Sequence, residues 1–331
     1  MDTDIKTIKQ EIKYFLLINF GLIAFISIFL FISASNSGSS KFIHNFAAMF
    51  MYIPAFSGIV VLKKISKCEF NSNVEQFLRV FTIFTLVRII TSIIDTFVFK
   101  SIFISSLIDT FISLYLVMLV LFKGSDFEIL DLSLSKNLKK IIFVIFLFLV
   151  LTIGRIYVGS ILDGSSTVNM NANFLAMICS FFLNFFFGFN LFFGEEFGWR
   201  YFLQPRIQKV YGKRFGVLIL GFIWGIWHLP LCFTLYSPKT PVYGVFNQVA
   251  FCILFGVFFG YAYMHTKNLW APILIHLVNN GVIMLGESYE SVITIDSILI
   301  CIVVNAIFFL PFLFTKEYKS KTVDEISTMD L

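Results

Sequence analysis

Long apolar runs separated by short polar connections dominate this chain of 331 residues. Because a helix of about 20 apolar residues crosses a bilayer, each run predicts one crossing. Ten spans are expected, at residues 13–34, 43–62, 77–98, 102–122, 141–160, 172–199, 214–235, 243–264, 269–286 and 294–315. The pattern therefore predicts an all-α polytopic membrane protein.

Lysine and arginine collect in alternate connections between these runs. One set holds Lys6, Lys9, Lys13, Lys63, Lys64, Lys67, Lys123, Lys136, Lys139, Lys140, the run 200–214, Lys267, Lys316, Lys319 and Lys321. The other set holds only Lys41, Lys100 and Lys239. Since basic residues favour the cytoplasmic side, we expect both termini in the cytoplasm, in the cell membrane if the host is a bacterium.

Composition excludes several classes of protein. With 58% hydrophobic and 14% charged residues and a mean hydropathy of +0.88, the chain is not a soluble domain. The five cysteines form no C-x-x-C pair, so no disulfide framework is expected. A net charge of +5 arises from lysines between the spans, so the bilayer is the expected partner and nucleic acid is not.

A local repeat marks the third and fourth spans. The segment 92–97 returns as 106–111, which places Asp95 and Asp109 at a similar depth, with Arg88 on the same helical side as Asp95. We interpret this as a helix hairpin tied by an Arg–Asp pair. An ion or proton site is the alternative.

Three segments of the C-terminal half carry polar residues within apolar runs. They contain Glu195, Glu196 and Arg200, then Trp224 and His228, then His276 and Asn280. Within the basic connection 204–214, counting back from Lys209 to Glu195 and forward from Arg214 to His228 gives about 14 residues each way, or roughly 21 Å of helix. We therefore expect both side chains at one depth, with His276 and Asn280 on one face of a third helix. His44 and His265 are expected to be plain interface residues.

Two local features sharpen this prediction. Pro230 removes a helical hydrogen bond, so it should bend the chain within a turn of His228. Glu196 and Arg200 stand at i and i+4 and can neutralise each other, which would leave Glu195 free.

The three segments together resemble the CPBP intramembrane protease family, the CAAX prenyl endopeptidases and bacteriocin-processing or immunity proteins also called Abi. The family pattern is Glu-Glu-x-x-x-Arg, then Phe-x-x-x-His, then His-x-x-x-Asn or Asp, and Trp224 stands in place of its Phe. The resemblance implies a catalytic core at 172–285. N-terminal spans at 1–158 lie outside it, and 286–331 holds the last span and a charged tail.

The resemblance also implies roles. Glu195 would activate the water with help from His228, while His276 and Asn280 would stabilise the oxyanion. Glu196 and Arg200 would maintain the helix geometry and local charge, and the role of Trp224 stays open.

A metal site is an alternative reading of the same residues. Glu195, His228 and His276 form a plausible zinc set, and the family has been described both as metalloproteases and as glutamate-dependent enzymes without metal. We favour the metal-free scheme, because Glu195 cannot readily be both ligand and base.

The expected substrate is a peptide or membrane-associated protein, presented from the cytoplasm or inner leaflet and cut near its C-terminus. In a bacterium, bacteriocin or other peptide processing, or self-immunity, fits better than a prenylated substrate. A catalytically silent immunity or scaffold protein is the main alternative. A transporter fits less well, because the buried polar residues concentrate in one half of the chain.

Overall fold

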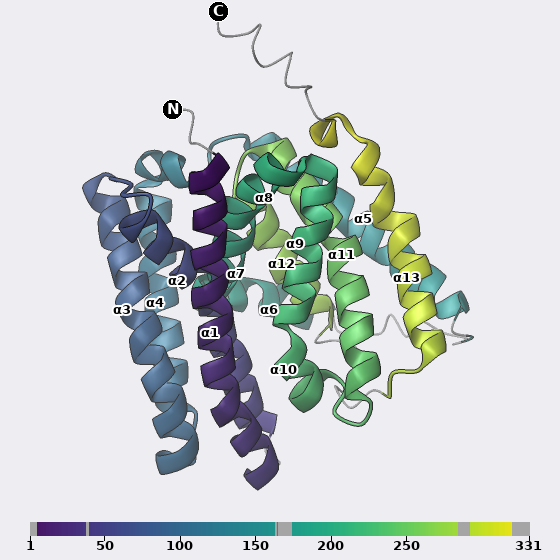
Figure 1. The fold of residues 1–331 in the computed structure, drawn as a ribbon, viewed down its shortest axis with the longest axis horizontal. Coiled ribbons are helices and arrows are strands. Elements are labelled where there is room, and N and C mark those ends of the chain that lie inside the picture. Colours follow the sequence, from purple (N-terminus) through teal and green to yellow (C-terminus); the bar gives the residue numbers. More distant parts are fainter. Residues whose placement is uncertain (1–4, 38–39, 163, 165–173, 284–291, 320–331) are drawn as a thin grey trace, which may run out of the picture.

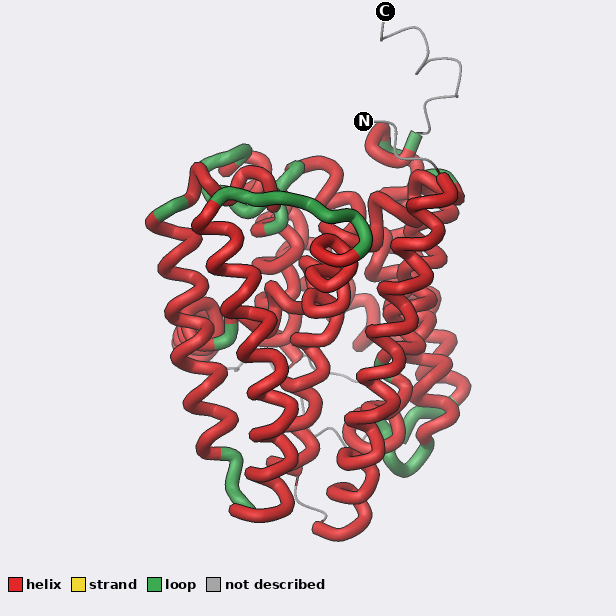
Figure 2. The backbone as a smooth tube through the Cα atoms, turned by 60° about the vertical axis from the view of Figure 1, so that its left-hand side comes forward, coloured by secondary structure: helices red, strands yellow, loops and turns green. Residues whose placement is uncertain are grey.

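The computed structural model describes residues 5–37, 40–162, 164, 174–283 and 292–319. Throughout these residues the regular structure is helical and includes no strand (Figure 2). The predicted all-α polytopic membrane fold is thereby confirmed. Most of the linker expected at 159–173, and the tail beyond residue 319, lie outside the described residues.

Seven helices among the described residues are long and apolar enough to span a bilayer. They are α1 (Ile5–Ser37), α2 (Ser40–Lys64), α3 (Ser72–Ile94) with its π-helical extension η1 (Asp95–Phe99), α4 (Phe103–Phe122), α5 (Leu138–Leu162), α11 (Pro241–Thr266) and α13 (Ile295–Phe309) with the 3-10 turn η5 (Leu310–Phe314). An eighth span results only if α9 (Lys213–Trp227) is counted with α10 (Leu229–Leu231) and η4 (Cys232–Tyr236), from which it is bent by 42°. The expected count of ten is not confirmed.

Two of the expected spans are short internal pieces. The run 172–199 breaks at Gly188 into α6 (Phe174–Phe187) and α7 (Phe189–Glu196), then continues as the π-helical η3 (Phe197–Leu203) and as α8 (Gln204–Tyr211). The run 269–286 yields only α12 (Trp270–Ile283). Hydropathy does not separate a lipid-facing helix from one buried by other helices, and a broken helix is tolerated where protein surrounds it. Figure 1 shows α6, α7 and α12 within the bundle.

Helix α2 is the central N-terminal helix and packs against α1, α3, α7 and η3. Gly194 and Gly198 face it: a Cβ atom at Gly194 would lie 2.3 Å from the Met51 carbonyl oxygen, and one at Gly198 would lie 2.3 Å from Pro54. Only glycine permits this approach. The two glycines that flank the glutamates thus bring the glutamate-bearing segment directly onto α2.

The α3–α4 hairpin is tied by a buried Arg–Asp ion pair, as the repeat predicted. Arg88 binds Asp109 through Nε at 2.8 Å and through Nη2 at 3.0 Å. Asp95 instead accepts the backbone N–H of Ser105 at 2.7 Å. The pairing crosses the hairpin because Asp109 lies on the opposite helix, within reach of the long arginine side chain.

The two ends of the bundle differ. At one end, called here the terminal end, lie the start of α1, the 3-10 turns η2 (Gly124–Leu130) and η6 (Lys316–Tyr318), α8, and the turn before α12 (Figure 1). Arg206 of α8 pairs with Glu11 of α1 at 2.8 Å, and the Leu269 N–H donates to the Asp131 carbonyl at 2.6 Å. At the opposite, far end, Lys41 donates to the Lys100 carbonyl at 3.4 Å.

Candidate functional site

A cavity of about 500 Å³ lies between the short helices and α2. Its lining includes five residues predicted from the sequence: Glu195, Trp224, His228, His276 and Asn280. They come from α7, from α9 and the bend that follows it, and from α12. The other two predicted residues, Glu196 and Arg200, are fully buried behind this wall and do not line the cavity.

Glu195 presents a carboxylate to the cavity. Its residue exposure is 3%, and its Oε2 accepts a hydrogen bond of 3.1 Å from the indole Nε1–H of Trp224. A phenylalanine at position 224 could not make this bond. The residue that departs from the family pattern therefore holds the carboxylate in place.

Glu196 is occupied on both oxygens. Arg200 donates from Nε to Oε2 at 2.9 Å, and His276 donates from Nδ1 to Oε1 at 2.8 Å. The i, i+4 pair expected from the sequence is present, and the link to the third helix is additional. Glu196 thus joins η3 to α12 and orients one imidazole of the cavity wall.

Arg200 is held by rings as well as by Glu196. Its guanidinium carbon lies 4.8 Å from the ring centroids of both Trp224 and Phe259. Nη1 and Nη2 have no hydrogen-bond partner among the described residues. Aromatic faces attract a desolvated cation, so the two rings stabilise the charge where oxygen acceptors do not.

His228 follows the last residue of α9, at the bend that Pro230 predicted. Its Nδ1 lies 2.8 Å from the Trp224 carbonyl oxygen, which can only accept, so Nδ1 carries the proton. In the neutral ring this leaves the lone pair on Nε2. The backbone geometry of the bend therefore selects the tautomer that can accept a proton or hold a water.

Asn280 has a neighbour that the sequence interpretation missed. The Asn279 side chain, also on the cavity wall, donates to Asn280 Oδ1 at 3.4 Å. With its oxygen engaged, Asn280 keeps its amide hydrogens for a ligand. The adjacent asparagines were a visible signal for this pairing.

Helix α2 supplies the other wall of the cavity, through His44, Ala47, Ala48 and Met51. These residues lie at i, i+3, i+4 and i+7, so they share one helical face. His44, expected to be a plain interface residue, also lines the cavity with its exposed side chain. His265 instead pairs with Glu317 at 2.9 Å, away from this cavity.

The zinc set Glu195, His228 and His276 remains an alternative interpretation of these residues. No three His, Cys, Asp or Glu side chains in the described segments form a group able to hold a metal ion. Both site histidines bind protein partners, Trp224 and Glu196, through Nδ1, so Nε2 is the ring nitrogen that a ligand would contact.

Comparison with known proteins gives one match. A family model described as type II CAAX prenyl endopeptidase Rce1-like matches residues 170–282. No curated protein and no solved structure matches the chain. The matched segment runs from α6 to α12 and contains all seven site residues predicted from the sequence. Residues 170–282 are therefore similar to the Rce1-like family of CAAX-type endopeptidases, which confirms the resemblance seen in the three motifs.

Proposed function

We propose that this protein is an intramembrane endopeptidase in which Glu195 activates the water that cleaves a peptide bond. One observation carries the proposal. Of two adjacent buried glutamates, Glu196 is engaged by Arg200 and His276, whereas Glu195 faces the cavity beside His228. A general base must lie within reach of the water that it deprotonates, and of the two carboxylates only that of Glu195 lines the cavity.

Each site residue has a defined role in the proposed reaction. Glu195 takes a proton from a water positioned with the help of His228 Nε2, and the water oxygen attacks the scissile carbonyl carbon. The carbonyl oxygen becomes an oxyanion, stabilised by donors from His276 Nε2, when that ring is protonated, and from Asn280. The C–N bond then breaks, and the amine leaves with the proton held by Glu195.

The proposed mechanism uses no metal. In a zinc scheme Glu195 would have to be both ligand and base, which is the reason for preferring the metal-free scheme. Metal analysis tests this point: stoichiometric zinc that is lost in His276→Ala would overturn the metal-free scheme.

The proposed substrate is a peptide or membrane-associated protein cut near its C-terminus, by analogy with the family. For a bacterial host we favour peptide or bacteriocin processing, or self-immunity, over a prenylated substrate. A catalytically silent immunity protein would keep the same fold and bind a peptide without cutting it.

Cleavage of a peptide library by the purified protein tests the proposal, with products read by mass spectrometry. Glu195→Gln should lower cleavage at least 100-fold, within the range that positioned acid–base groups contribute. Glu128→Gln, an exposed glutamate of η2, is the matched control and should keep the wild-type rate. Full activity in Glu195→Gln would refute the proposed base. Binding without cleavage by the wild-type chain would favour the silent protein.

A further inference from the structure

The cavity extends from Glu195 in one direction, toward the far end of the bundle. On α2 its lining spans residues 44–51, near the far-end start of that helix at Ser40. On α11 it spans residues 248–255 of a helix that starts at the far end with Pro241. On the bent span it continues from Trp224 to Tyr236 of η4. The exposed His44 side chain lies at the outer edge of this lining.

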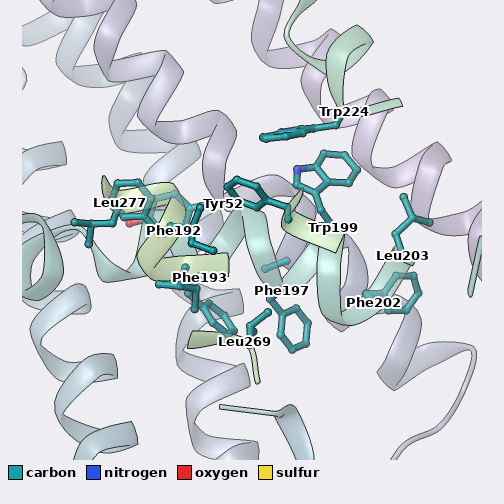
Figure 3. Close-up of a cluster of buried hydrophobic side chains, with 14 of the residues drawn as sticks. Tyr52, Phe192, Phe193, Phe197, Trp199, Phe202, Leu203, Trp224, Leu269 and Leu277 are labelled. Atoms are coloured by element: carbon teal, nitrogen blue, oxygen red, sulfur yellow. The ribbon is translucent and has the colours of Figure 1, made fainter. Parts of the chain in front are cut away.

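The terminal side of Glu195 is filled by side chains. Six residues on that side each have 0% exposure: Trp199, Arg200, Leu203, Phe258, Phe259 and Tyr318. Figure 3 shows two of these residues, Trp199 and Leu203, among buried hydrophobic side chains that include Phe197 and Phe202. Tyr318 belongs to the C-terminal turn η6 and donates its hydroxyl to the Val257 carbonyl at 2.6 Å. Protein interiors are close-packed, so a peptide cannot reach Glu195 from the terminal end without unpacking this cluster.

The terminal end is also the basic end. Its connections in the described segments contain Lys63, Lys64, Lys67, Lys123, Lys136, Arg206, Lys209, Lys213, Arg214, Lys267 and Lys316. The far-end connections contain Lys41, Lys100 and Lys239. Because short cytoplasmic connections carry the excess of Lys and Arg, the terminal end is assigned to the cytoplasm.

Together these observations reverse the expectation of a substrate presented from the cytoplasm. We propose, resting on the proposed function, that the substrate enters from the extracytoplasmic face of the membrane. The protein would cut a peptide segment that lies in, or reaches the site through, the outer half of the bilayer.

The cavity lining also specifies the chemistry of that segment. Among its described lining residues, Glu195 is the one carboxylate and no lysine or arginine is present; the rest are apolar, aromatic, amide or imidazole side chains. A charged substrate side chain would enter without a counter-ion other than the base itself, which is costly in an apolar cavity. The cleaved segment is therefore apolar and uncharged.

Cysteine labelling in sealed right-side-out vesicles tests the entry face. A membrane-impermeant maleimide should label His44→Cys and spare Lys209→Cys, an exposed position of α8 at the other end. Opening the vesicles should expose Lys209→Cys, and the wild-type protein with its five cysteines sets the background. Labelling of Lys209→Cys with protection of His44→Cys would overturn the proposal. Ala48→Cys, one turn along α2, repeats the test if His44→Cys fails to fold.

A blocking experiment tests the cavity as the route. Attachment of a bulky maleimide to purified His44→Cys should lower cleavage at least tenfold relative to the same variant before labelling. Labelled Lys209→Cys should keep its rate. An unchanged rate in labelled His44→Cys would contradict entry through this cavity.

Paired peptides test the substrate chemistry. A lysine or aspartate placed next to the cleaved bond should lower kcat/KM at least tenfold relative to leucine, and equal rates would contradict an apolar site. The vesicle labelling requires no activity. Full activity in Glu195→Gln would refute the proposed base without bearing on the entry face, which the labelling tests separately.

Discussion

Two buried arginine–carboxylate pairs, one in each half of the chain, have different degrees of hydrogen bonding. In the N-terminal pair every guanidinium nitrogen of Arg88 is used: Nε and Nη2 bind Asp109, Nη2 also binds Asn45 Oδ1 at 2.8 Å, and Nη1 binds Ser92. In the C-terminal pair only Nε of Arg200 binds an oxygen. The first pair is saturated and closed, as a structural tie should be.

In the second pair the hydrogen-bonding groups are shared with neighbouring residues. Glu196 gives one oxygen to Arg200 and the other to His276, while Trp224 stacks near Arg200 and also donates to Glu195. The same few groups thus neutralise a charge, orient an imidazole and hold a second carboxylate at the cavity. We infer that the first pair contributes mainly to stability and the second mainly to catalysis. The following variants test that contrast.

The largest expected effect is on stability at the N-terminal pair. Asp109→Leu leaves Arg88 buried at 1% exposure without its counter-ion, and we expect a loss of about 3–5 kcal/mol in the free energy of unfolding. The double variant Arg88→Met with Asp109→Leu should recover most of this loss, because it leaves no unpaired charge. Unfolding in detergent measures both. A double variant as unstable as the single one would contradict the structural interpretation.

At the C-terminal pair the main effect should be on the rate. Glu196→Gln keeps the shape but removes the charge that holds Arg200 and orients His276, so kcat should fall about 100-fold, as when an oxyanion donor is lost. KM should change little, since Glu196 does not line the cavity. Steady-state kinetics separates the two constants. A rise in KM at constant kcat would place Glu196 in substrate binding instead.

Trp224→Phe restores the family residue and removes the hydrogen bond that the indole N–H donates to Glu195. Hydrogen bonds to charged groups contribute about 1.5–3 kcal/mol, so we expect kcat/KM to fall at least tenfold. Trp199→Phe is the matched control: its indole nitrogen has no partner in the described part of the chain, and its ring does not line the cavity. The control should lose stability but keep its rate per folded molecule. Equal kinetic losses in both variants would show that ring volume matters, not the hydrogen bond.

Much of this site was predictable because its signals are local. Counting residues from the basic connection predicted that Glu195 and His228 lie at one depth, and both line the same cavity. Pro230 predicted the bend at which His228 lies. The i, i+4 spacing of Glu196 and Arg200 also distinguished the role of Glu196 from that of Glu195. These inferences depend only on helix geometry, which is the same in lipid and in protein.

The rest depends on distant packing that a single sequence does not contain. Hydropathy could not show that the run 172–199 breaks at Gly188 and is enclosed by other helices. Nothing local connects His44 to a site more than 150 residues later in the chain, and an apolar run gives no hint that the Trp224 indole faces a carboxylate. The direction in which the cavity extends likewise depends on which halves of the surrounding helices are packed by side chains.

The smallest expected effect tests whether the two pairs are coupled. Tyr52 of α2 donates to Asp109 at 2.6 Å and accepts a hydrogen bond from Asn190 of α7, which lies five residues before Glu195. Tyr52→Phe removes this link while the ring stays in place, so it should cost about 1 kcal/mol of stability. If the pairs act independently, its effect should add to that of Glu196→Gln within about 0.5 kcal/mol in a double-mutant cycle. A larger coupling energy, or a lower kcat in Tyr52→Phe alone, would show that the N-terminal pair also positions the catalytic helix.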